Sequence, residues 1–159
     1  MTAISEPTRD PLIELVEIRG SERPVRRRAA VAASAGFLVI AAFEVALALG
    51  APFGAAAFGG ANPGTLPPPL RVAGGVSAAV WIFAALLILA RGGISLAPLP
   101  AALSRRGTWF LAGYLALGTV MNFASSSPWE RYGWAPVSLA LMILCIAVAR
   151  GGRSGRVSQ

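Results

Sequence analysis

Glu44 and Arg71 are the first residues of this sequence whose types and positions point to chemistry. Glu44 is the one acidic residue inside a long apolar run, and Arg71 stands at the start of the next run. A charged side chain in hydrocarbon costs at least a few kcal/mol, so it normally faces protein, finds a partner or stays protonated. Because the two residues fall near the same end of successive antiparallel helices, we predict a salt bridge between them.

Further polar residues gather at that end of the predicted helices. Asn122 lies near the end of the third apolar run, and Glu130 and Arg131 follow shortly after it. The predicted polar cluster is therefore Glu44, Arg71, Asn122, Glu130 and Arg131. It is either a clamp that fixes helix order or a binding site for a small ion, a proton or a lipid headgroup. Glu44→Gln separates the two: a clamp loses folded yield, whereas a proton site keeps its fold and loses activity.

The residue types needed for most other chemistry are missing. The sequence has no histidine, and its one cysteine, Cys145, lies inside an apolar run. No intrachain disulfide or His/Cys metal cluster can form, so we expect no cofactor and no metal site. An enzyme needs positioned acid, base or nucleophile groups, and we expect this chain not to be one. A hydrolase that uses carboxylates alone stays open.

The composition indicates a membrane protein. Of the 159 residues, 55% are hydrophobic and 13% are charged, against about 25% charged residues in an average soluble domain. The mean hydropathy is +0.65. The apolar residues form long blocks almost free of charge, for which lipid is the natural solvent.

The apolar blocks predict an all-α fold, a bundle of four transmembrane helices. The first block has roughly 21 residues, which at 1.5 Å per residue matches a hydrocarbon core of about 30 Å. Cleavage of this block as a signal peptide after Ala48 is a rival interpretation. Five prolines and five glycines in 50–70 predict an irregular outer loop. The predicted domains are a polar tail at 1–28, a transmembrane domain at 29–149 with helices at about 29–49, 72–90, 107–124 and 135–149, and a basic tail at 150–159.

The arginines orient the predicted bundle. All 14 basic residues are arginine, and the net charge is +7. Twelve of them lie in the two tails and in the connection between the second and third helices. Since positive charge marks the cytoplasmic side, both termini are expected in the cytoplasm of a bacterial plasma membrane. No nucleic-acid partner is expected. The expected partners are the lipid bilayer and, left open, a membrane protein or further copies of this chain.

Two stretches carry a resemblance to a known family. They are Leu49-Gly50-Ala51-Pro52-Phe53-Gly54 and Trp129-Glu130-Arg131, the latter followed by Trp134 and Pro136. Together with Met121-Asn122, they resemble an uncharacterised family of small four-helix integral membrane proteins of actinobacteria, over about residues 30–150. Phe53 stands where that family would be expected to have tryptophan. The resemblance implies no activity and no catalytic residues.

The sequence thus favours a structural or accessory role within a membrane assembly. The alternative is a small transporter, or an ion-binding or lipid-binding membrane protein, that uses Glu44. Four helices with a glutamate in the first are also similar to small multidrug-resistance transporters. This chain departs from them in its polar tail, its proline-rich first loop and the position of Glu44, which is farther from mid-membrane.

Overall fold

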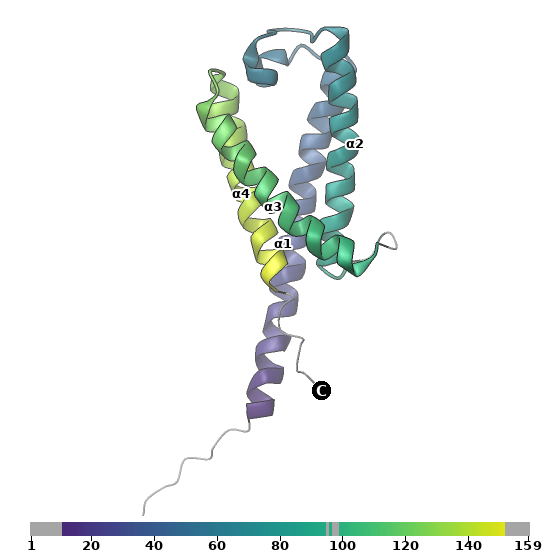
Figure 1. The fold of residues 1–159 in the computed structure, drawn as a ribbon, viewed down its shortest axis with the longest axis vertical. Helices are drawn as coiled ribbons and strands as arrows, with labels where there is room; N and C mark the ends of the chain where they lie inside the picture. Colours follow the sequence, from purple (N-terminus) through teal and green to yellow (C-terminus); the bar gives the residue numbers. More distant parts are fainter. Residues whose placement is uncertain (1–10, 95, 97–98, 152–159) are drawn as a thin grey trace, which may run out of the picture.

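The chain folds into four helices and no strand within the described residues, as a computed structural model shows (Figure 1). It describes the backbone of 11–94, 96 and 99–151, and the side chains from Arg23 onward within those ranges. The all-α prediction is confirmed. The helices are α1 (Pro11–Ala48), α2 (Pro68–Arg91), α3 (Ala101–Ala124) and α4 (Ala135–Arg150), the last preceded by a π-helical turn, η3 (Glu130–Trp134).

Proline and glycine set where several helices begin and end. Helix α2 begins directly after Pro67 and has proline in its first turn, where a missing N–H costs nothing. After Arg91 the chain turns at Gly93, whose φ of 83° suits glycine. Helix α3 follows Pro100. These residues confine the apolar sequence between them to separate helices.

Three helices extend beyond the apolar blocks. Helix α1 starts at Pro11 and runs through Pro24, so residues predicted as a polar tail belong to the first helix. Helices α2 and α3 begin at Pro68 and Ala101, ahead of the predicted 72 and 107. Apolar periodicity marks only the part of a helix suited to lipid, whereas the backbone pattern continues through polar residues. Residues 1–10 and 152–159 of the predicted tails lie outside the described residues.

The helices pack as two antiparallel pairs, α1 with α2 and α3 with α4, and α1 also contacts α4. The pairs diverge toward one end, where the α1–α2 connection (49–67) crosses above the space between them (Figure 1). We call this connection the first loop, and we call this end of the molecule, with 49–67 and 125–134, the loop end. Small side chains fill much of the core, among them Ala30, Ala33, Ala84, Ala85 and Cys145.

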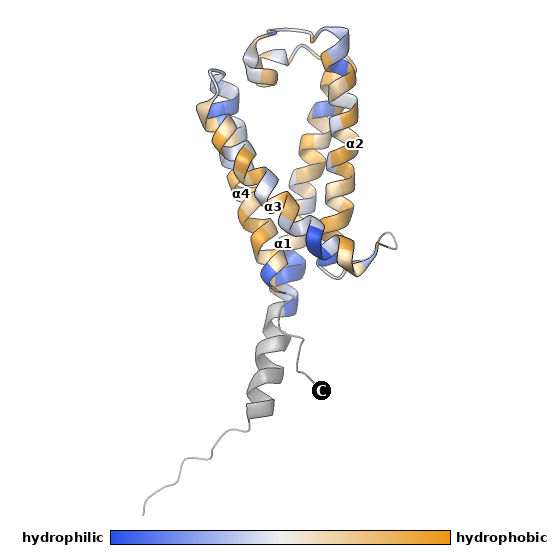
Figure 2. Ribbon diagram, in the orientation of Figure 1, coloured by the Kyte–Doolittle hydropathy of each residue, from blue (hydrophilic) through white to orange (hydrophobic). Residues whose placement is uncertain are grey.

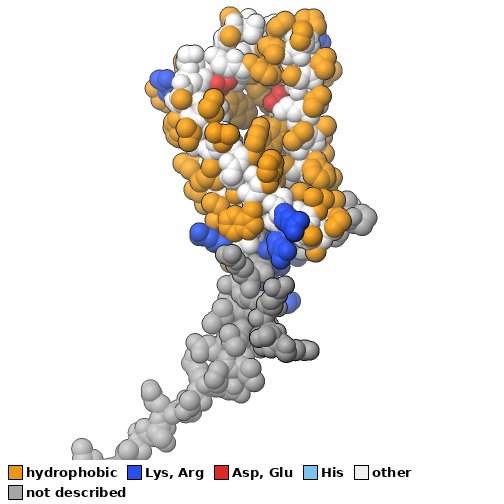
Figure 3. All heavy atoms as spheres, in the orientation of Figure 1, with side chains coloured by type: hydrophobic (Ala, Val, Ile, Leu, Met, Phe, Trp, Pro, Cys, Tyr) orange, Lys and Arg blue, Asp and Glu red, His pale blue; other side chains and the backbone are white. Residues whose placement is uncertain are grey.

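The surface of the bundle is apolar on its sides. Large apolar side chains on all four helices are more than half exposed, including Val39, Val76, Phe110 and Ile143. Figures 2 and 3 show hydrophobic residues along the helices and basic residues gathered mainly at one end. By length and composition, Arg23–Ala48, Pro68–Arg91 and Glu130–Arg150 can cross a membrane, and α3 does not meet the same criterion. The described chain is therefore compatible with a membrane protein.

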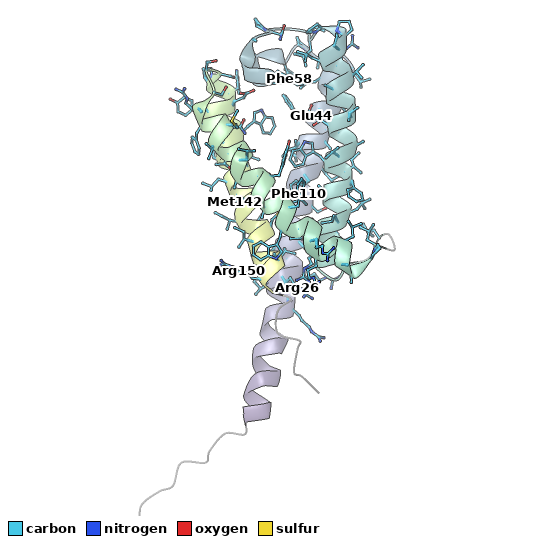
Figure 4. All side chains as sticks on the ribbon, in the orientation of Figure 1. Arg26, Glu44, Phe58, Phe110, Met142 and Arg150 are labelled. Atoms are coloured by element: carbon cyan, nitrogen blue, oxygen red, sulfur yellow. The ribbon has the colours of Figure 1, made fainter. Side chains whose placement is uncertain are left out.

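The opposite end of the bundle, where Figure 4 labels Arg26 and Arg150, we call the arginine end. By their positions on the helices, it also carries Arg27, Arg28, Arg91, Arg105 and Arg106. Two of these arginines bind the end of α4. Arg26 Nη1 donates to the Gly151 carbonyl at 3.0 Å, and Arg91 Nη2 donates to the Ala149 carbonyl at 3.0 Å. The last carbonyls of a helix have no partner within it and carry partial negative charge, so cations stabilise them.

Candidate functional site

The first loop is held over the loop end by hydrogen bonds to the α3–α4 connection. The Gly59 N–H donates to Glu130 Oε1 at 2.8 Å, and Ser127 Oγ donates to the Ala55 carbonyl at 2.8 Å. The Trp134 indole Nε1 donates to the Ala56 carbonyl at 2.9 Å. Since the loop follows α1 and its partners lie beside α4, these bonds join the two helix pairs where they diverge.

Phe58 sits at the turn of the first loop in an uncommon backbone conformation. Its φ is 52°, in the left-handed region that bulky residues rarely adopt. Gly59 and Gly60 follow with φ of 74° each. The reversal brings Phe58 to the wall of a cavity beneath the loop. Figure 4 shows Phe58 and Glu44 at the same end of the molecule.

A cavity of about 190 Å³, which we call the polar cavity, lies beneath the first loop. All four helices, η3 and the first loop contribute to it. Its polar lining residues are Glu44 from α1, Asn122 from α3, Glu130 from η3 and Ser138 from α4. Among the residues that the structure describes, no arginine lines it. Figure 3 shows acidic side chains on either side of a hollow near this end.

Aromatic side chains form much of the rest of the wall. Phe43, Phe58, Trp81 and Trp134 line the polar cavity. Phe43 packs against Trp134 with ring centroids 4.8 Å apart and planes tilted by 54°. The face of an aromatic ring carries negative electrostatic potential, which attracts a cation. The polar cavity thus combines two carboxyl groups with aromatic faces, and none of its described lining residues is basic.

The Glu44 carboxyl lies where α1 meets α2 at the edge of the polar cavity. Oε1 accepts a hydrogen bond from Ser77 Oγ at 3.0 Å. Oε2 is buried and has no hydrogen-bond partner. It lies close to Gly74, where an added Cβ would come within 3.3 Å of it. One oxygen of Glu44 is therefore removed from water without a donor, an arrangement that costs free energy unless a partner arrives.

The predicted salt bridge between Glu44 and Arg71 is not formed. Arg71 Nε instead donates to the Ala48 carbonyl at 3.0 Å, near the end of α1. Arg131 likewise turns to a nearby carbonyl, because its Nη2 donates to Ser125 O at 2.7 Å. A guanidinium group is a strong donor, and free carbonyls at a helix end compete for it. Of the five predicted cluster residues, Glu44, Asn122 and Glu130 share the cavity wall, and Arg71 and Arg131 do not line it.

Asn122 has a definite partner across the α3–α4 pair. Its Nδ2 donates to Ser138 Oγ at 3.2 Å, and both residues line the polar cavity. Sequence reasoning missed Ser77, Ser138 and the aromatic wall. Phe43, adjacent to Glu44, and Trp81, one turn beyond Ser77, were the available signals. Trp134 is half-buried and hydrogen-bonded to the first loop.

Comparison of the chain with protein-family models, with curated proteins and with solved structures gives no match. Within the described residues, no group of three or more His, Cys, Asp or Glu side chains is placed to hold a metal ion.

Proposed function

We propose that this chain is a four-helix membrane protein whose polar cavity binds a small organic cation through Glu44. The unpartnered Oε2 of Glu44 carries this proposal. A cation in the cavity would balance the charge of the Glu44 carboxylate, and the aromatic faces of the cavity would surround the rest of the ligand. Glu130 adds a second carboxyl, although its Oε1 already accepts the Gly59 N–H.

Four crossings are proposed because α3 has features that allow it to act as the fourth span. It has 24 residues, as many as α2, or about 36 Å at helical rise. Its buried hydroxyls are satisfied within the helix: Thr108 Oγ1 donates to Ser104 O at 2.7 Å, and Thr119 Oγ1 to Leu115 O at 2.7 Å. With an even number of crossings, the arginine end faces the cytoplasm of a bacterial plasma membrane and holds both termini.

Binding rather than catalysis is proposed because the cavity offers two carboxyl groups and no nucleophile paired with a base. A structural or accessory role in a membrane assembly is the competing proposal. Under that proposal the cavity holds no ligand, and pull-downs from native membranes recover a stoichiometric partner.

Binding of radiolabelled choline to the full chain in lipid nanodiscs tests the proposal. We expect saturable binding of choline. The neutral isostere 3,3-dimethylbutanol should compete at least tenfold less well than unlabelled choline does, because the isostere lacks the positive charge. Glu44→Gln should weaken choline binding at least tenfold, or about 1.4 kcal/mol. Its amide oxygen still accepts from Ser77, so the melting temperature should stay close to that of the wild type.

The matched comparison is Glu130→Gln, which removes the other carboxylate charge and keeps the acceptor for Gly59. It should weaken choline binding less than Glu44→Gln does, because the carboxylate of Glu130 is already hydrogen-bonded. Binding should also weaken as the pH falls, since protonation of Glu44 removes the charge that attracts the ligand. Choline binding that is absent, or that is unchanged by Glu44→Gln, contradicts the proposed function.

A further inference from the structure

A second cavity, which we call the apolar cavity, adjoins the polar one. Its volume is about 570 Å³, within the range of about 300–1,000 Å³ typical of ligand pockets. It lies between α1, the first loop and the segment 129–137. Its described lining residues include no charged side chain; Pro52, Phe53, Trp129 and Val137 are among them. The apolar cavity therefore suits a hydrocarbon group and offers nothing to a headgroup.

The two cavities have a common border. Phe43, Ala56 and Trp134 line both of them. Trp134 packs on Phe43 and donates to the Ala56 carbonyl, so these residues form a wall between the two cavities. A molecule that occupies both has to cross the edge of this wall, with its polar part on the side of Glu44 and Glu130 and its apolar part on the side of Pro52 and Val137. The arrangement is a match for an amphiphile in both charge and polarity.

The apolar cavity is also bounded by side chains on the surface of the bundle. Trp129 is 65% exposed and Phe53 is 50% exposed. In the proposed orientation, this surface faces the outer leaflet, where single-chain amphiphiles partition. A ligand can then reach the cavity sideways from lipid without passing through the core.

We propose that the natural ligand is a single-chain amphiphile with a cationic amine or ammonium head, its hydrocarbon tail occupying the apolar cavity. This inference rests on the proposed function for the position of the head. The apolar cavity adds the hydrocarbon tail, and the tail defines the class of ligand. The carboxyl groups of the polar cavity select the positive head, and the border residues fix where the tail begins.

Gly133 provides the test variant. It lines the apolar cavity, and a Cβ added there would meet nothing within 4 Å, so a larger side chain can be added without a clash. Gly133→Phe is therefore expected to fold and to occupy the space of the tail. Gly113→Phe is the matched control, since Gly113 also has open space and lies on α3, away from the cavity. Val137→Trp fills the same cavity from α4 as a second variant.

The experiment measures binding of labelled decyltrimethylammonium and of labelled choline to each protein in nanodiscs, with uptake by empty nanodiscs subtracted. We expect decyltrimethylammonium to bind at least tenfold more tightly than choline in the wild type and in Gly113→Phe. In Gly133→Phe and Val137→Trp this advantage should fall below threefold, while choline binding stays unchanged.

The two ligands decide separate questions. Decyltrimethylammonium that fails to bind, or that binds the filled variants as tightly as the wild type, overturns the inference about the tail. Loss of choline binding in all proteins contradicts the proposed function instead. Choline that binds through Glu44, without any advantage for the decyl compound, retains the proposed function and removes the amphiphile.

Discussion

Trp134 joins more parts of the loop end than any other side chain discussed above. Its indole N–H donates to the Ala56 carbonyl of the first loop at 2.9 Å. Its ring packs on Phe43 of α1 and lines both cavities. A tryptophan in a half-buried position combines a large apolar ring with one donor, and here both are used.

Trp134→Phe should loosen the first loop and leave the helices intact. It keeps an aromatic ring and removes one hydrogen bond, which is worth roughly 0.5–1.5 kcal/mol. Hydrogen exchange of the amides in 55–60 should accelerate about two- to tenfold, because local opening of the loop becomes easier. Trp109→Phe, at a residue 42% exposed on α3, is the control and should not change exchange in 55–60. Equal exchange in wild type and Trp134→Phe would mean that the indole does not hold the loop.

The sequence predicts which residues share the polar cluster only where a nearby helix end fixes how deep a residue lies in the bundle. Glu44, Asn122 and Glu130, each near the same end of its segment, share the wall of the polar cavity. The partners were not predictable in the same way. Arg71 and Arg131 have long side chains, and their choice between a carboxylate and a nearby carbonyl depends on local geometry that a sequence does not show.

At the scale of elements, helices α1 and α2 approach closely because glycine removes side chains from their contact. An added Cβ on Gly74 would lie 3.2 Å from the Glu44 carbonyl oxygen, a backbone atom. An added Cβ on Gly92 would overlap the Cβ of Ala30. Close approach at small residues is the main way in which helices associate in lipid.

Gly92→Ala should destabilise the bundle, because the Ala30 Cβ is short and rigid and cannot swing away. Overpacking of this kind typically costs about 1–3 kcal/mol. The expected result is a melting temperature several degrees lower in detergent. Gly113→Ala is the control, because a Cβ there meets nothing within 4 Å and alanine favours helix. A Gly92→Ala protein as stable as the wild type would show that the α1–α2 contact can widen at little cost.

Apolar runs separated by proline and glycine predict the number of helices. They do not predict the residues at which the helices begin. Helix α1 continues through Pro24, because proline removes one donor and adds a local clash that a long helix with packed turns beyond it can tolerate. The first loop was predicted as irregular. Its short 3₁₀ turns at Gly54–Ala56 and Phe58–Gly60 and its bonds to the α3–α4 connection depend on residues more than 60 positions away, which local patterns do not reach.

At the scale of the whole molecule, the arginine end serves two purposes in our account. In the proposed topology it faces the cytoplasm, and Arg26 and Arg91 also hold the last turn of α4 against α1 and α2. The orientation depends on α3 being a span, since three crossings would place the two termini on opposite sides of the membrane.

A reporter fused after Gln159 tests the number of crossings. We expect green fluorescent protein at this position to fluoresce and alkaline phosphatase to be inactive, because a cytoplasmic C-terminus favours the first and prevents activity of the second. Fusion of alkaline phosphatase after Ser126, at the loop end, should be active and provides the control for export. An active phosphatase after Gln159 would contradict the four-span topology and, with it, the placement of the cavities toward the outer leaflet.

The length of α1 has a mechanical consequence. The helix has 38 residues, of which the candidate span Arg23–Ala48 accounts for 26. The remainder, 11–22, is a rod of about 18 Å at helical rise, continuous with the segment that carries Glu44. Pro24 lies where this rod joins the span, and its missing N–H makes this the point at which α1 bends most easily.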